Sequence, residues 1–196
     1  MYAFFKGTIA DTEEDALIVE VNSIGYRIYV PKDMLLSAKI GSSITVYTYT
    51  CVREDAFILY GFSSKEDLSL FKLLITVSGV GPKMGLAILS SMDANSIRTA
   101  IIMQDAKLLS SAPGVGAKTA GRIILELKDK VSPLDIIYSS KDDVTNETVI
   151  NLRQEAYEAL ISLGVTNLKA TQALNEIEIT EDSKIEDIIK QLLTKI

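Results

Sequence analysis

Two glycine-containing segments hold the residues best suited to bind a ligand. The first is Gly79–Gly81, of sequence Gly-Val-Gly, with Lys83 two residues further on. The second is Gly114–Gly116, also Gly-Val-Gly, and Lys118 follows at the same spacing, 35 residues later in the chain. A glycine at the start of a helix leaves backbone N–H groups uncovered at the positive end of the helix dipole, which favours an anion. The added lysine makes the pattern a prediction of two phosphate-binding turns.

Other interpretations of these glycines are weaker or plainer. The plainest is a pair of helical hairpins in which the glycines only close tight turns. A dinucleotide-binding loop needs a third glycine and a preceding strand, and neither segment has them. Residues 112–119 approach a phosphate-binding P-loop, but Ala117 stands where glycine must precede the lysine, and helical rather than strand sequence comes before.

Composition excludes several kinds of chemistry. The 196 residues contain no histidine and a single cysteine, Cys51, so catalytic triads with histidine and structural zinc sites are ruled out. We therefore predict no metal and no cofactor. Net charge is −6, yet residues 63–135 carry 9 Lys and Arg against 7 Asp and Glu, whereas residues 1–62 carry 5 against 8 and residues 136–196 carry 6 against 11. Only the middle third is net basic, and it contains both glycine segments.

The elements that must position these glycines can be inferred from periodicity. Residues 1–62 contain five short runs rich in Val, Ile, Thr and Tyr, at 2–9, 16–21, 25–30, 43–52 and 56–61, with a turn expected at 31–33. Five short strands in this length suit a small barrel. Glu54 and Asp55 fall at the turn between the last two strands, where they would ordinarily form a solvated tip.

A helical period replaces the strand period at Ser63. Residues 63–66 fit a capping box, and helical sequence continues to about residue 131, before Ser132 and Pro133. The polar run at 139–146 predicts a linker, which we place at 136–148. Three helices are then expected at 149–163, 167–177 and 184–195, the last opened by a second capping box at 183–186. In that small bundle, Leu160, Leu163 and Val165 belong either to the core or to a protein interface.

The N-terminus does not have the pattern of a signal peptide, and the apolar stretches fall short of the ~20 residues that a membrane helix needs. With one thiol and no export signal, we expect a cytoplasmic protein without a membrane partner.

The residues at 51–62, 70–90 and 111–130, taken in this order, resemble the RuvA family, the Holliday-junction-binding subunits of the bacterial branch migration complex. The resemblance extends over essentially the whole chain. It implies a multidomain α+β protein with an OB-like barrel at 1–62, a tandem helix-hairpin-helix domain at 63–135, a linker at 136–148 and a three-helix domain at 149–196. It also implies a homotetramer, or an octamer made of two of them.

The resemblance further implies roles for individual residues. Glu54 and Asp55 correspond to an acidic pin at the centre of the tetramer, where they would repel the crossing strands. The C-terminal domain, with Leu160, Leu163 and Val165, would bind the hexameric ATPase RuvB, and the RuvC resolvase is a further candidate partner. The chain itself would not be an enzyme. The residues implied to contact DNA phosphates are Gly79, Gly81, Lys83, Gly114, Gly116, Lys118 and Arg122.

Two alternatives belong to other functional classes. Residues 113–120 also resemble the helix-hairpin-helix of DNA glycosylases, which need an aspartate beyond it, and some of which bind an iron–sulfur cluster through four cysteines. Asp135 is the candidate here, but it follows the expected helix end and the chain has one cysteine. The other alternative is a protein-interaction module without a DNA role, in which the matched lysines would be accidental.

Overall fold

The structure is a computed structural model that describes residues 1–131, 147–166, 169–170, 173–174, 176–177, 179–181 and 183–194. The chain forms two compact units, residues 1–128 and 129–196, which are described separately. Asp135, most of the predicted linker and much of the predicted helix at 167–177 lie outside the described residues. Glu147 and Thr148, which the polar pattern assigns to the linker, instead begin a helix.

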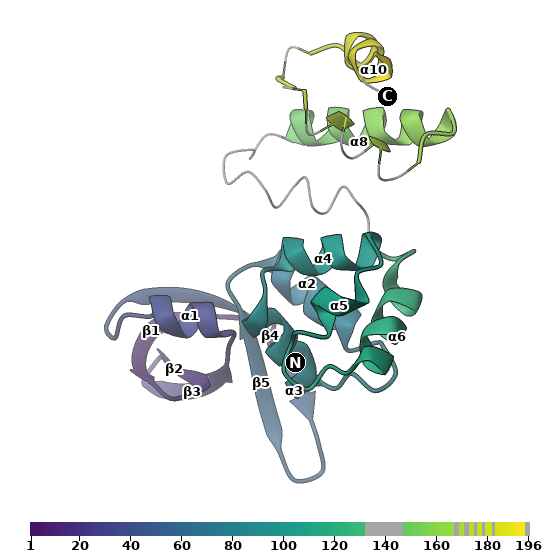
Figure 1. The fold of residues 1–196 in the computed structure, drawn as a ribbon. Helices are drawn as coiled ribbons and strands as arrows, with labels where there is room; N and C mark the ends of the chain where they lie inside the picture. The colour runs from purple at the N-terminus through teal and green to yellow at the C-terminus, as the bar shows by residue number, and fades with distance from the viewer. Residues whose placement is uncertain are drawn as a thin grey trace. The chain divides into compact units, whose positions relative to one another are not determined.

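Residues 1–62 fold into a closed barrel with strand order β1-β2-β3-β5-β4 (Figure 1). Successive residues of a strand face opposite sides of the sheet, and the inward set forms an apolar core that includes Leu17, Ile28 and Val46. The barrel closes through a short parallel pairing of Tyr29 with Tyr60. The predicted OB-like barrel is confirmed. Its strands are β1 (Phe4–Thr12), β2 (Ala16–Val21), β3 (Ile24–Tyr29), β4 (Ser43–Val52) and β5 (Phe57–Phe62).

A short helix, α1 (Lys32–Ser37), lies between β3 and β4, where the sequence predicts only a turn. Pro31 precedes it as the N-cap, a place where a missing N–H removes no helical hydrogen bond. Met34 is buried in the barrel core. The prediction of a plain turn is therefore wrong, because six residues are too few for an apolar period to show.

The hairpin of β4 and β5 projects well beyond the other barrel strands (Figure 1). Its two strands pair continuously from Tyr47 with Phe62 to Val52 with Phe57, and the Arg53 amide donates to the Ala56 carbonyl at 2.8 Å. The turn between them holds the two carboxylates predicted there.

The N-terminal residues lie along the same hairpin. The Tyr2 amide donates to Thr50 Oγ1 at 3.2 Å, and Thr48 Oγ1 donates to the Tyr2 carbonyl at 3.0 Å. The Tyr2 ring meets the Phe57 ring edge to face, with centroids 5.9 Å apart. These contacts support the part of β4 that extends past its pairing with β1.

Five helices follow the barrel within the same unit, and we call residues 63–128 the helical part. Phe71 on the first of them is fully buried, with its ring centroid 4.7 Å from Phe62 and 5.7 Å from Tyr60. The barrel and the helical part therefore share a core, which fixes the hairpin relative to the helices. The helices are α2 (Lys65–Leu74), α3 (Pro82–Ser91), α4 (Ala94–Ile102), α5 (Ala106–Leu109) and α6 (Ala117–Leu127).

The N-cap of α2 is one residue later than the sequence predicts. Ser64 Oγ accepts a hydrogen bond from the Asp67 amide at 3.0 Å, while Ser63 Oγ donates to the Asp67 carboxylate at 3.2 Å. The capping box at 63–66 is therefore wrong by one position, because two adjacent serines offer the same cap and packing of the helix decides between them. The last helix of the helical part, α6, ends at Leu127, whereas the sequence predicts helical structure to about residue 131.

The second unit contains α8 (Glu147–Ser162) and α10 (Ile185–Leu193), which pack through an apolar core. The capping box predicted at 183–186 is not formed. Lys184 is the N-cap residue, and Ser183 Oγ instead accepts from the Thr180 amide at 2.9 Å. Throughout the described residues, helices that could cross a membrane are absent.

Candidate functional site

The two glycine segments have nearly the same backbone. We call residues 77–81 the first turn and residues 112–116 the second turn. Gly79 and Gly114 have positive φ angles of 91° and 82°. Gly81 and Gly116 are the N-caps of α3 and α6, with φ, ψ of −85°, 171° and −84°, 166°. The sequence repeat is therefore a structural repeat, as its spacing predicted.

Each turn is closed by the same hydrogen bond and the same apolar plug. The Val80 amide donates to the Val77 carbonyl, and the Val115 amide donates to the Ala112 carbonyl, both at 3.0 Å. Val80 is 4% exposed and Val115 is 5% exposed. The buried valines hold the flanking glycines at the surface, where all four glycines are exposed.

The two glycines of each turn have different reasons to be glycine. Gly79 and Gly114 need it, because a side chain in the left-handed region is strained. Gly81 and Gly116 do not, since their φ angles suit any residue. A Cβ built on either would also meet no described atom within 4 Å. Folding alone therefore does not explain the missing side chain at the start of α3 and α6.

Gly85 shows what a glycine required by packing looks like. A Cβ there would lie 3.1 Å from Phe71 Cε2, so α3 can approach α2 only with glycine at this position. Gly81 and Gly116 have no such close neighbour among the residues that the structure describes.

Three neighbouring helices close their own N-termini with side chains. Ser64 caps α2, Asp93 caps α4 and Asp105 caps α5, each accepting a backbone N–H. Partial burial would raise the pKa of Asp93, but hydrogen bonds from Ser96 outweigh it and hold the pKa below its usual value. The carboxylate is thereby kept ionised at the helix terminus, where the dipole favours negative charge.

In α3 and α6 the same place is left open. Within the described part of the chain, no side chain caps either helix, and neither helix has an acidic residue in its first turn. Each has an exposed lysine there instead, Lys83 in α3 and Lys118 in α6. Uncovered amides, a helix dipole and a cation are thus placed together twice, which is the arrangement that binds a phosphate.

Arg122, the last of the predicted DNA-contacting residues, is half-buried and reaches from α6 to the first turn. Its Nη1 atom donates to the Ser78 carbonyl at 2.9 Å and to Ser78 Oγ at 3.3 Å. The structure therefore ties α6, the helix that begins at the second turn, to the first turn through this side chain. Sequence reasoning placed Arg122 near Lys118 but gave no sign of Ser78, which is 44 residues away.

Glu54 and Asp55 are exposed at the tip of the β4–β5 hairpin, as predicted. Figure 1 shows the turns before α3 and α6 at the end of the helical part toward which this hairpin projects. The two carboxylates and the two uncovered helix termini are thus carried by one compact unit.

The residues predicted to bind a partner in the second unit differ in exposure. Leu160 is fully buried in the core of that unit, and Val165 packs against the same core while remaining partly exposed. Leu163 is 62% exposed, just before Gly164, which has a φ of 86°. Leu160 therefore supports the fold, and of the three only Leu163 and Val165 offer surface to another protein.

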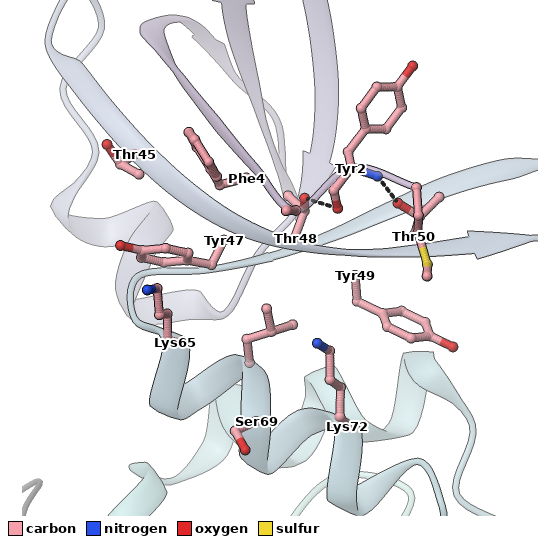
Figure 2. A pocket seen from close by; sticks show the side chains of 13 residues that line it. Tyr2, Phe4, Thr45, Tyr47, Thr48, Tyr49, Thr50, Lys65, Ser69 and Lys72 are labelled. Carbon is pink, nitrogen blue, oxygen red and sulfur yellow. Dashed lines mark hydrogen bonds between the residues drawn. The ribbon is translucent and has the colours of Figure 1, made fainter.

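A pocket of about 740 Å³ lies between the N-terminal residues, β4 and α2. Figure 2 shows Lys65 and Lys72 of α2 below the tyrosines of β4, and the Lys65 ammonium is 5.9 Å from the centroid of the Tyr47 ring. The thirteen described residues that line it include no carboxylate, thiol or imidazole. Nor do the described residues contain a cluster of side chains able to hold a metal ion.

The backbone angles predict different stability effects at two glycines of one turn. Gly114→Ala is expected to lower the free energy of unfolding by about 1–2 kcal/mol, the cost of a side chain in the left-handed region. Gly116→Ala is expected to change it by less than about 0.5 kcal/mol, because neither its backbone nor its surroundings oppose a Cβ. Urea unfolding followed by circular dichroism measures both, and equal losses would contradict this account of the turn.

Comparison with known proteins agrees with this architecture. Residues 1–61 match the family "RuvA N terminal domain", residues 71–129 match "SAM-like Helix-hairpin-helix tandem", and residues 151–195 match "RuvA, C-terminal domain".

Three full-length relatives are named Holliday junction branch migration complex subunit RuvA. The one from Alkaliphilus oremlandii is 44% identical over 198 residues and covers 98% of this chain and 97% of its own. Those from Lachnospira eligens and Clostridium botulinum are each 40% identical, covering 100% and 98% of this chain and 99% and 98% of theirs. Since relatives of this similarity match end to end and the three regions occur in the same order, the chain belongs to the RuvA family.

Proposed function

We propose that this chain binds four-way (Holliday) DNA junctions by structure rather than by sequence, holds them open and recruits the RuvB motor for ATP-driven branch migration. The observation that supports this most is the choice of glycine at Gly81 and Gly116. Neighbouring helices are capped by serine or aspartate, whereas α3 and α6 leave their first amides uncovered. The described fold has room for a side chain at both glycines, so packing does not require glycine there. Two such phosphate contacts suit a protein that works on DNA in recombination and repair.

The proposed DNA contacts are to the backbone of the nucleic acid. Phosphate contacts fix the position of a protein on DNA but carry no sequence information, and no residue of either turn is built to reach a base edge. Binding that depends on phosphates follows the path of the strands, so it can favour a crossed arrangement. The residues that we assign to it are Gly79, Gly81, Lys83, Gly114, Gly116, Lys118 and Arg122.

We assign Glu54 and Asp55 to an acidic pin. In a homotetramer, four hairpin tips would bring eight carboxylates to the centre, where strands exchange between arms. A carboxylate about 4 Å from a phosphate costs about 1 kcal/mol in bulk water and more where water is excluded. Repulsion at the centre keeps the junction open and opposes a continuous duplex lying across it.

The remaining assignments follow from the same proposal. Residues 1–62 form the tetramer, which can pair into an octamer. Residues 63–135 bind DNA, and residues 136–148 link them to the C-terminal domain. Residues 149–196 bind RuvB, with Leu163 and the partly exposed Val165 as the apolar contacts. RuvC is a further candidate partner. The chain is a non-catalytic subunit of a cytoplasmic complex, because its proposed site holds and orients DNA while the partner hydrolyses ATP.

The test compares a synthetic four-way junction with linear duplex of the same arms in a gel shift over a range of salt, beside light scattering for the mass of the complex. We expect tighter binding of the junction and a steep loss of affinity with salt. Lys118→Ala should weaken binding at least about fivefold on every arm sequence and lower the salt slope by about 0.9 for each phosphate that the lysine no longer neutralises.

The matched control is Lys107→Ala, which removes an exposed lysine of α5 that is a member of neither turn. It should leave affinity and slope nearly unchanged. Loss of binding to one arm sequence only would contradict backbone recognition, and equal affinity for junction and duplex would contradict structure-selective binding.

A further inference from the structure

Arg122 of α6 contacts the first turn, 44 residues away in the chain. One nitrogen, Nη1, donates to both the carbonyl and the hydroxyl of Ser78. The same atom would lie 3.6 Å from a Cβ built on Gly79, so the guanidinium rests against the glycine of positive φ. The helix that begins at the second turn thus holds the loop of the first.

The internal repeat differs at both partners of this contact. Shifted by 35 residues, Arg122 corresponds to Ala87 and Ser78 corresponds to Pro113. The side chain of alanine cannot donate a hydrogen bond, and proline has no hydroxyl to accept one. The second turn therefore has no counterpart of the contact, although its glycines, valine and lysine match those of the first. Among these two repeats, only the first turn is contacted by an arginine of the other repeat.

We propose that Arg122 is a positioning residue that sets the separation and direction of the two phosphate-binding turns. The effect on DNA binding rests on the proposed function, whereas the contact between Arg122 and Ser78 does not. Helix α2 packs against both α3 and α6, so it sets the coarse arrangement of the turns. The Arg122–Ser78 contact then fixes the loop whose amides must meet one phosphate while those of the second turn meet another.

Such a role differs from a simple phosphate contact. Because Nη1 is already engaged, the guanidinium can offer only its other nitrogens to DNA. A positioning residue affects the first turn even when no DNA is present. It also makes the first turn dependent on Arg122, so that Lys83 can contribute to binding only while Arg122 is in place.

The first experiment measures amide hydrogen exchange by NMR on the full chain without DNA. The reporter is the Val80 amide, and the Val115 amide is the internal reference, because both make the same turn hydrogen bond. Arg122→Ala should speed exchange at Val80 about tenfold relative to Val115, since it removes a charge-assisted bond that closes the loop. Arg122→Gln, which keeps a neutral donor, should give a smaller increase, and Lys118→Ala should give none.

The second experiment measures coupling between residues in junction binding. Lys83→Ala and Lys118→Ala are each introduced into the wild type and into Arg122→Ala. Lys83→Ala should weaken binding about fivefold in the wild type but less than about twofold beside Arg122→Ala, whereas Lys118→Ala should cost the same in both.

The outcomes separate this inference from the proposed function. Unchanged exchange at Val80, or equal increases at Val80 and Val115, would overturn the positioning role whether or not the protein binds DNA. Independent costs of Lys83→Ala and Arg122→Ala would show that Arg122 contributes only its own contact with DNA and does not position the first turn, which would also overturn the inference. Failure of the wild type to bind junctions would overturn the proposed function. The rate of hydrogen exchange at Val80 would still decide whether Arg122 positions the first turn.

Discussion

Replacing both Gly81 and Gly116 with aspartate is expected to lower junction affinity at least about 30-fold while the protein folds normally. The two backbones already have N-cap geometry, and aspartate is among the best N-cap residues. Stability should therefore rise by a few tenths of a kcal/mol at each helix. Binding should fall because the new carboxylates occupy the amides and repel phosphate.

The magnitude follows from the charges. A carboxylate and a phosphate about 4 Å apart repel by about 1 kcal/mol in bulk water and about 4 kcal/mol at the effective dielectric constant near a protein surface. Two such pairs in each protomer cost about 2–8 kcal/mol, and about 1.4 kcal/mol corresponds to a factor of ten in affinity. Isothermal titration with a four-way junction measures the loss.

Two control variants separate charge, size and position. Gly81→Ala with Gly116→Ala adds bulk without charge and should weaken binding less than the aspartates do. Thr99→Asp with Gln191→Glu adds the same negative charge at exposed positions of α4 and α10 and should bind nearly as the wild type does. Strong junction binding by the double aspartate variant would show that the helix termini do not hold phosphates.

Neutralising the pin, by Glu54→Gln with Asp55→Asn, is expected to tighten binding to linear duplex about tenfold or more in the tetramer. Affinity for the junction should change far less, since in a four-way junction no continuous duplex lies across the hairpin tips. The ratio of junction to duplex affinity should therefore fall about tenfold. A competition gel shift, with labelled junction and unlabelled duplex, measures that ratio directly.

The matched control neutralises another adjacent acidic pair at a hairpin turn. Glu14→Gln with Asp15→Asn changes the charge equally at the exposed β1–β2 turn and should leave the ratio unchanged. If the pin variant discriminates as well as the wild type does, the carboxylates have no part in selecting the junction.

Much of this architecture could be predicted because its signals are local. The strands at 16–21 and 43–52 begin and end where the runs rich in Val, Ile, Thr and Tyr predicted, and each packs one face into the barrel core. The two glycine segments are recognisable from glycine, valine and lysine within five residues of each other. Their shared backbone angles then follow from the same short sequence.

The features that escaped prediction depend on competition or on distance. Ser64 rather than Ser63 caps α2, and Ser183 bonds to Thr180 rather than opening α10. At α2 two adjacent hydroxyls competed for one cap, and at α10 the Ser183 hydroxyl had two acceptable partners. The contact of Arg122 with Ser78 has no sequence signal, because only the packed helices bring the two residues together.

The long β4–β5 hairpin also has a mechanical consequence. Its interstrand hydrogen bonds run perpendicular to the strands, from Tyr47 with Phe62 to Val52 with Phe57. A force along the hairpin axis therefore loads these bonds in shear and together, not one after another. If the tips lie at the junction centre as we propose, all six paired positions of the hairpin would resist such a pull from moving strands at once.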